Sequence, residues 1–124
     1  MLAFDHVNIR TANLERAVAF YEEVLGMTSG KRPPFPFPGA WMYIGEQALV
    51  HLVAIDEAPD LPHAPEALRL EHFAFRGEDL GGQRARLAKA GVAVEEVLVP
   101  GFNILQLNFY DPDGNHIHVD FKPE

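Results

Sequence analysis

The sequence contains no cysteine, which excludes disulfide bonds and thiolate metal sites. Basic residues are few: the sequence has ten Lys and Arg but eighteen Asp and Glu, which gives a net charge of −8. The Lys and Arg residues form no continuous run. This balance argues against binding to nucleic acid or to an anionic membrane surface. The longest nearly apolar stretch, ALVHLVAI (48–55), is far too short to cross a bilayer. The start, MLAFDHVNIR, lacks the features of a signal peptide, so we expect a cytoplasmic protein.

The 124 residues, 48% of them apolar, suit one compact domain with a real core. Helical periodicity is clearest after Asn13, a candidate N-cap, and Gly26 is placed to end that helix. A weaker helix spans 80–90, between the candidate cap Asp79 and Gly91. Strand patterns occupy 2–10, 40–45, 48–55, 70–76, 92–99, 104–110 and 115–121, with a short edge strand within 27–32. The proline-rich segment 32–39 is expected to be a loop or lid.

The two halves of the chain repeat one another. His6 and His72 are 66 positions apart, as are the two candidate caps, whereas His51 and His118 are 67 apart. Each half has the order β-α-β-β-β, so we interpret the chain as an internal duplication with modules at about 1–56 and 69–124 and a linker at 57–68. The fold class predicted is therefore α+β, with 1–124 forming a single domain.

Histidine recurs at matching positions of the repeat, on the first and last strand of each half. In every strand the histidine falls on the face opposite the apolar side chains that we assign to helix packing. Considered alone, each histidine is more simply explained as a core residue whose ring nitrogens hydrogen-bond to the backbone than as a metal ligand. Four buried imidazoles together would be costly unless each nitrogen were paired, and a divalent metal would satisfy several at once. We therefore predict a metal site formed by at least three of these residues: His6, His51, His72 and His118.

The last strand, NHIHVDF, carries two more polar side chains on the same face as His118. Asp120 could be a further ligand, an acceptor for an imidazole N–H, a general base or a carboxylate in solvent. His116 lies beside the preceding turn and is expected to be exposed, as is His63 in the linker.

Several stretches together resemble the vicinal oxygen chelate superfamily, which includes glyoxalase I, extradiol dioxygenases, fosfomycin-resistance proteins and bleomycin-binding proteins. The stretches are FDHVNIRTANLERAVAFYEEVLGM at the start, EHFAF opening the second half, and DPDGN before the last strand. The resemblance implies two βαβββ modules, related by a pseudo-twofold axis, that form a curved mixed sheet around a central cavity. It also implies a homodimer and a divalent metal (zinc, nickel, iron or manganese) at the four positions already chosen.

One departure from the family pattern concerns the metal ligands. The position of His118 usually holds glutamate in metal-dependent members, and that of His51 often does in glyoxalase-like members. A ligand glutamate is thought to shuttle protons in glyoxalase I, so that chemistry is in doubt here. An all-nitrogen site would carry more positive charge and bind an anionic oxygen more strongly.

The leading hypothesis is a small metal-dependent enzyme whose ion chelates vicinal oxygens of a small substrate, with Asp120 as candidate base. The alternatives are a drug-binding protein without catalysis and a scaffold with four satisfied histidines. For each residue proposed to contact substrate, ordinary packing in the core or in a loop is at least as simple an explanation as substrate binding. These candidate substrate-binding residues are Asn8, Arg10, Phe35, Trp41, Tyr43, Gln106 and Asn108.

Overall fold

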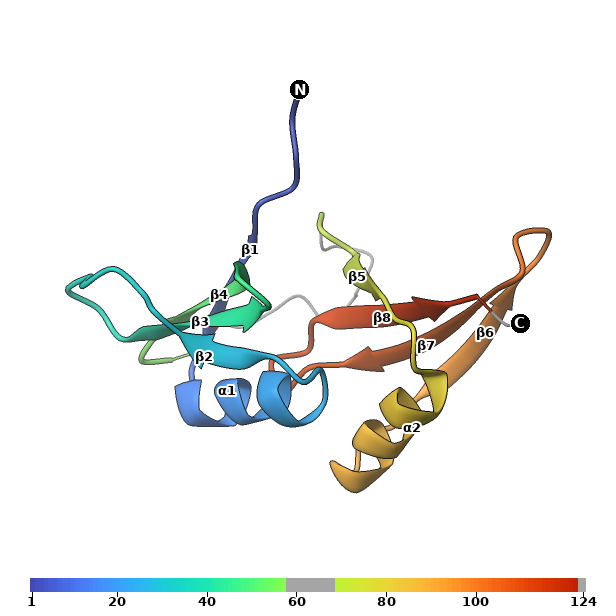
Figure 1. Cartoon of the computed structure of the whole chain (residues 1–124). Helices are drawn as coiled ribbons and strands as arrows, with labels where there is room; N and C mark the ends of the chain where they lie inside the picture. The colour runs from blue at the N-terminus through green and yellow to red at the C-terminus, as the bar shows by residue number, and fades with distance from the viewer. Residues whose placement is uncertain (58–68, 123–124) are drawn as a thin grey trace. The chain divides into compact units, whose positions relative to one another are not determined.

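The computed structural model describes residues 1–57 and 69–122, in two compact units, Met1–Pro59 and Asp60–Glu124 (Figure 1). Most of the expected linker, including His63, lies outside the described residues.

The N-terminal unit contains one helix and a four-stranded mixed sheet. Its elements in chain order are β1 (Val7–Thr11), α1 (Leu14–Glu23), β2 (Thr28–Gly30), β3 (Gly39–Ile44) and β4 (Gln47–Ala54). The strands lie in the order β1-β4-β3-β2, with β1 parallel to β4 and the other neighbours antiparallel. The parallel pair is made possible by the crossover through α1 and the β2–β3 hairpin.

The C-terminal unit repeats this topology. Its elements are β5 (His72–Arg76), α2 (Leu80–Lys89), β6 (Glu95–Val99), β7 (Ile104–Tyr110) and β8 (His116–Phe121). The strand order is β5-β8-β7-β6, and again only the pair β5–β8 is parallel. The predicted α+β class and the βαβββ repeat are therefore confirmed.

Some strand boundaries differ from the prediction. The first strand was expected from residue 2 but begins at Val7, so His6 lies immediately before it. Likewise β5 begins at His72 rather than residue 70, and β6 at Glu95 rather than residue 92. Strand pairing explains the difference, because β1 and β5 are assigned only where β4 and β8 run beside them. The segment 31–38 is a loop, as its prolines predict.

Both helices begin at the caps that the sequence predicts. The Asn13 side chain accepts a hydrogen bond from the backbone N–H of Arg16 at 3.1 Å, and Asp79 accepts one from Gly82 at 3.0 Å. Gly91 follows α2 with φ of +69°, a conformation that residues with a Cβ rarely adopt. The same side-chain chemistry therefore starts the helix in both units.

The core of each unit lies on the apolar face of its sheet. In the N-terminal unit α1 packs against β3 and β4, and its Tyr21 is fully buried. In the C-terminal unit Leu107, Ile117 and Val119 are buried on β7 and β8. Because side chains alternate along a strand, the residues between them point to the opposite face, which carries the predicted site residues.

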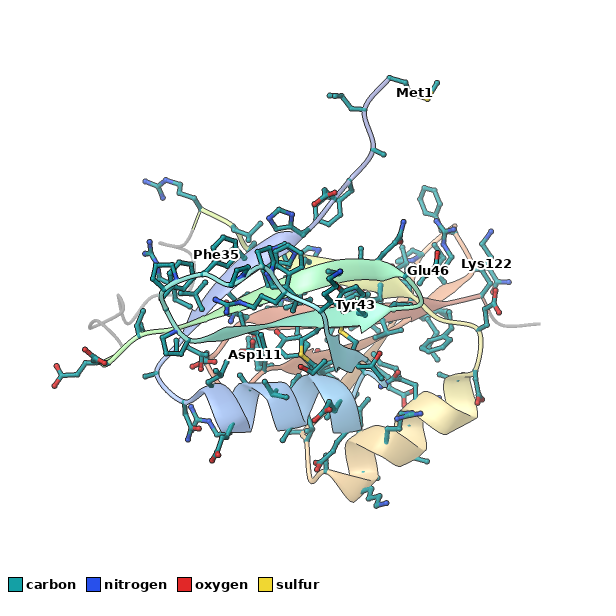
Figure 2. All side chains as sticks on the ribbon, turned by 60° about the vertical axis from the view of Figure 1, so that its left-hand side comes forward. Met1, Phe35, Tyr43, Glu46, Asp111 and Lys122 are labelled. Carbon is teal, nitrogen blue, oxygen red and sulfur yellow. The ribbon has the colours of Figure 1, made fainter. Side chains whose placement is uncertain are left out.

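The DPDGN motif builds the turn before β8. Asp111 (labelled in Figure 2) is buried, and its carboxylate accepts hydrogen bonds from the backbone N–H groups of Asp113 and Asn115 at 2.9 and 2.8 Å. Its other oxygen accepts from the Asn115 side chain at 2.9 Å. The motif thus has a structural role here, since it fixes where β8 begins.

Candidate functional site

The polar face of the C-terminal sheet gathers the site residues predicted for this unit. The register of β8 places His118 beside Asn108 and Asp120 beside Gln106 on β7. On its other side, β5 places His72 next to His116. Directly paired residues share a face of the sheet. The predicted residues of β5, β7 and β8 therefore lie on one face of the unit.

His118 is held by a carboxylate from its own strand. Its Nδ1 lies 2.5 Å from Oδ1 of Asp120, two residues along β8 on the same face. His118 is 7% exposed, so the contact orients a buried ring. A carboxylate that accepts the Nδ1 proton leaves Nε2 with the lone pair that a metal requires. Asp120 is thus placed as an acceptor for an imidazole N–H, one of the roles considered for it; its role as a base stays a prediction.

The N-terminal unit brings its two histidines together as a stack. The rings of His6 and His51 have centroids 3.8 Å apart and planes within 7° of parallel. Trp41 covers the other face of His51 at 3.9 Å. Imidazole lone pairs lie in the ring plane. Two rings in parallel planes therefore direct their lone pairs within those separate planes and not toward a common point. One ring must turn before both can bind one ion. Burial, and secondarily the nearby His6, lower the pKa of His51 and favour the neutral ring that ligation needs.

All four predicted metal ligands follow one pattern of hydrogen bonding. One ring nitrogen faces an oxygen: Nδ1 of His6, His72 and His118 lies 2.5 Å from the carboxylates of Asp5, Glu71 and Asp120, and Nε2 of His51 lies 3.0 Å from the Ala48 carbonyl. Among the residues that the structure describes, the second nitrogen of each ring has no hydrogen-bond partner. Ligands oriented by an oxygen on one nitrogen are typical of protein metal sites, so these residues fit a metal ion.

The expectation that His116 is exposed is wrong. Its side chain is 19% exposed, because the parallel neighbour β5 and Asn108 on β7 enclose it. Its Nε2 lies 2.9 Å from Oδ1 of Asn108 and its Nδ1 lies 3.1 Å from Glu71.

Sequence reasoning missed Glu71 altogether. Residue 71 lies one position before β5, and strand alternation would have assigned it to the apolar face. Outside the paired strand its carboxylate reaches both His72 and His116. Each residue of this group offers one ligand atom within 4.8 Å of the others.

The predicted aromatic wall lies in the N-terminal unit beside His51. Trp41 and Tyr43 line an open pocket of about 440 Å³ that His51 also borders. Phe35 lies 6.4 Å from Trp41, ring centre to ring centre, and is 42% exposed; Figure 2 labels it together with Tyr43. The Tyr43 hydroxyl donates to the Lys31 carbonyl at 2.5 Å, which ties β3 to the start of the proline-rich loop.

Asn8 and Arg10, the remaining predicted residues, lie on β1. Asn8 is paired with His51 across the parallel register, so it shares the face of the histidine stack. Arg10 pairs with Val53 one step further along the same face and is exposed. Their contact with substrate stays a prediction.

Neither helix in residues 1–57 and 69–122 is long and apolar enough to span a membrane.

Known proteins show the same fold and a related sequence. The chain is 29% identical over 123 residues to Glyoxylase I 4 of Arabidopsis thaliana, a match that covers 96% of this chain and 70% of the relative. A crystal structure of a glyoxylase/bleomycin resistance protein/dioxygenase domain from Frankia sp. EAN1pec superposes with a TM-score of 0.81 at 22% identity, covering 100% of this chain and 94% of that one. The genomically encoded fosfomycin resistance protein of Listeria monocytogenes shares the fold with a TM-score of 0.73 at 14% identity, over 99% and 95% of the chains.

A family model also matches the sequence. The model of the Glyoxalase/Bleomycin resistance protein/Dioxygenase superfamily matches residues 3–119, which is nearly the whole sequence. The resemblance predicted from the sequence motifs is confirmed, and the chain belongs to this superfamily.

Proposed function

We propose that this protein is a small metal-dependent enzyme whose ion chelates vicinal oxygens of a small substrate. The proposed ligands for divalent zinc, nickel, iron or manganese are His6 and His51 in the N-terminal unit and His72 and His118 in the C-terminal unit. The superfamily includes glyoxalases and dioxygenases, which makes catalysis plausible for this chain.

One observation supports the proposal above the others. In all four rings one nitrogen is held by an oxygen, and the other has no hydrogen bond to any residue that the structure describes. This observation carries weight for the buried rings of His51 and His118, because a core imidazole satisfied by the protein would pair both nitrogens. The expectation of four buried imidazoles is wrong, since the His6 and His72 side chains are 38% and 43% exposed and water can pair their second nitrogens. The repeat-related histidines also lie side by side within each unit, with ring centres 3.8 Å apart for His6 and His51 and 4.6 Å apart for His72 and His118.

The bound ion would polarise substrate oxygens and stabilise negative charge that develops on them. The chain's own groups would do the rest. Asp120 holds the His118 ring and is the nearest candidate for moving a proton. Gln106 and Asn108, on the same face as His118, would orient polar groups of the substrate, and Arg10 would hold an anionic one. Trp41 would exclude water from the side of the histidine stack.

A second candidate function is binding without catalysis. The observation that favours it is the set of exposed rings near the proline-rich loop, where Phe35 and Phe37 stack at 5.1 Å and are 42% and 41% exposed. Exposed aromatic rings bind flat apolar molecules well. This function would not require a metal.

We also propose that the two units act together as one domain, and that the protein is a cytoplasmic homodimer with a small molecule as its partner. The superfamily supports the small-molecule partner and the dimer.

Metal analysis of the purified protein tests the proposal. We expect about one ion per chain by mass spectrometry of the elements, and His72→Ala should remove it. His63→Ala, at a position predicted to lie outside the site, is the matched control and should keep the ion. Metal affinity should also fall below about pH 6, because a ligating imidazole must be neutral. A metal-free protein that binds small aromatic molecules, unaffected by chelator, would instead establish the second function.

A further inference from the structure

Three side chains in the C-terminal unit cluster at the N-terminal end of β5 and β8. The parallel register places His72 directly beside His116, with their ring centres 5.2 Å apart. Glu71 precedes β5, and a single oxygen of it, Oε2, lies 2.5 Å from Nδ1 of His72 and 3.1 Å from Nδ1 of His116. Two imidazole nitrogens therefore converge on one carboxylate oxygen.

The contacts of His116 direct its Nδ1 at the carboxylate. Its Nε2 lies 2.9 Å from Oδ1 of Asn108, and its Nδ1 faces Glu71 across 3.1 Å. A cation at this point would be bound by imidazole nitrogen and carboxylate oxygen together.

Asn108 holds the far side of the His116 ring. Its side-chain amide contacts Nε2 at 2.9 Å, which leaves Nδ1 directed toward Glu71. A contact on the nitrogen that does not face the ion is typical of metal-binding imidazoles.

We propose that Glu71, His72 and His116 form a divalent-cation site of their own within the C-terminal unit. Two imidazoles and one carboxylate are a ligand set suited to Fe(II), and the same donors also bind Zn²⁺. The site uses Nδ1 of His72, whereas the four-histidine centre proposed above requires Nε2 of that ring. A neutral imidazole has one lone pair, so His72 can serve only one of the two sites at a time.

The cluster is accessible to an ion from solvent. The side chains of Glu71 and His72 are 67% and 43% exposed, whereas His116 beneath them is 19% exposed. The exposed carboxylate loses little hydration on binding, and the half-buried His116 ring fixes the geometry. Binding would displace a proton from each imidazole whose Nδ1 is protonated, so affinity should fall with falling pH.

Calorimetric titration of the full chain with Zn²⁺, after removal of metal with chelator, tests the site. We expect Glu71→Gln and His116→Asn each to weaken one Zn²⁺-binding event by more than about 100-fold, since loss even of groups that only orient ligands costs 10- to 100-fold. Glu22→Gln, which removes the same charge from an exposed position of α1, should leave the titration unchanged. Titrations of Glu71→Gln and His116→Asn that superimpose on the unsubstituted protein would overturn the inference.

A further variant separates this site from the four-histidine centre. His6→Asn removes a ligand of that centre but should leave the Glu71-dependent event intact. If His6→Asn abolishes all Zn²⁺ binding and Glu71→Gln changes nothing, the four-histidine centre stands and this site does not. The reverse pattern supports this site and counts against the other. Should His116→Asn fail to fold, Glu71→Gln still decides, because the Glu71 side chain is 67% exposed.

Discussion

The two units share a topology but differ in how much of it they bury. In the N-terminal unit, α1 buries Ala17, Phe20 and Tyr21, whereas Leu87 is the only buried residue of α2. Edge strand β6 leaves Leu98 63% exposed. The repeat therefore preserves strand order and register but not the quality of packing. The side chains of the two halves have thus diverged around a shared strand order.

The surroundings of the histidines differ in the same way. In the N-terminal unit the His51 ring is stacked between Trp41 and His6, an apolar setting that lowers its pKa. In the C-terminal unit, imidazoles are contacted by the carboxylates of Glu71 and Asp120 and by the amide of Asn108. The N-terminal unit has one such carboxylate contact, from the highly exposed Asp5 to His6. The comparison teaches that ring stacking dominates in one unit and polar side-chain contacts dominate in the other.

The largest expected effect tests the difference in packing. Tyr21→Ala should lower the free energy of unfolding by about 3–5 kcal/mol, because it removes a fully buried aromatic ring. Leu98→Ala should change it by less than about 0.5 kcal/mol, since that side chain is 63% exposed. Urea denaturation measures both. An equal loss of unfolding free energy in Tyr21→Ala and Leu98→Ala would show that the outer face of β6 is covered in solution. The proposed difference in packing between the two units would then be wrong.

The next effect compares the carboxylates that hold histidines in the two units. Asp120→Asn should weaken Zn²⁺ binding by about 10- to 100-fold, because it releases the buried His118 ring. Asp5→Asn should weaken it by less than about fivefold, since the Asp5 side chain is 86% exposed and exposed pairs contribute little. Calorimetry on both variants measures the ratio. A larger loss for Asp5→Asn would reverse the assignment of the dominant polar side-chain contacts to the C-terminal unit.

A smaller effect should be equal in the two units. Asn13→Ala and Asp79→Ala each remove a side chain that accepts the hydrogen bond at the start of a helix. Each should cost about 1 kcal/mol of unfolding free energy, because the cap satisfies one otherwise unpaired N–H. Thermal denaturation followed by circular dichroism suffices. Neutral effects of both substitutions would mean that these caps do not contribute in solution.

The smallest effect is the pH dependence of stability expected from His51. Burial lowers the pKa of His51 below its ordinary value of 6.5, so the unfolded chain binds this proton more readily than the folded chain. Stability from this group is present above about pH 6.5 and declines as pH falls toward the lowered pKa. Unfolding measured between pH 5 and 7 in chelator should show this slope, and His51→Asn should reduce it. Restricting the range to above pH 5 keeps Glu71 ionised, since the imidazoles of His72 and His116 lower its pKa from 4.5.

Much of the fold can be predicted from the sequence because its helices and strands depend on the spacing of residues within short segments. The helix caps, the strand alternation and the 66-residue offset all follow from spacing along the chain, and the structure confirms the elements they predict. Placement of the histidines opposite the apolar face was predictable for the same reason, since alternation fixes which side chains share a face.

The missed parts of the site depend on contacts between strands. Glu71 lies outside the paired region of β5, where alternation no longer determines direction, and its partner His116 is 45 positions away. The turn beside His116 suggested exposure, but Asn108 from β7 and the neighbouring β5 enclose it. Such contacts follow from strand register, which the spacing of residues within one strand does not specify.

X-ray absorption at the metal edge of the purified, metal-loaded protein tests the central claim most directly, because it counts imidazole ligands. We expect a nearest shell at about 2.0–2.1 Å for zinc, with outer-shell scattering from at least three imidazoles. Loss of imidazole scattering in His72→Ala should accompany loss of the ion. A shell of oxygen ligands alone, unchanged by that substitution, would contradict it.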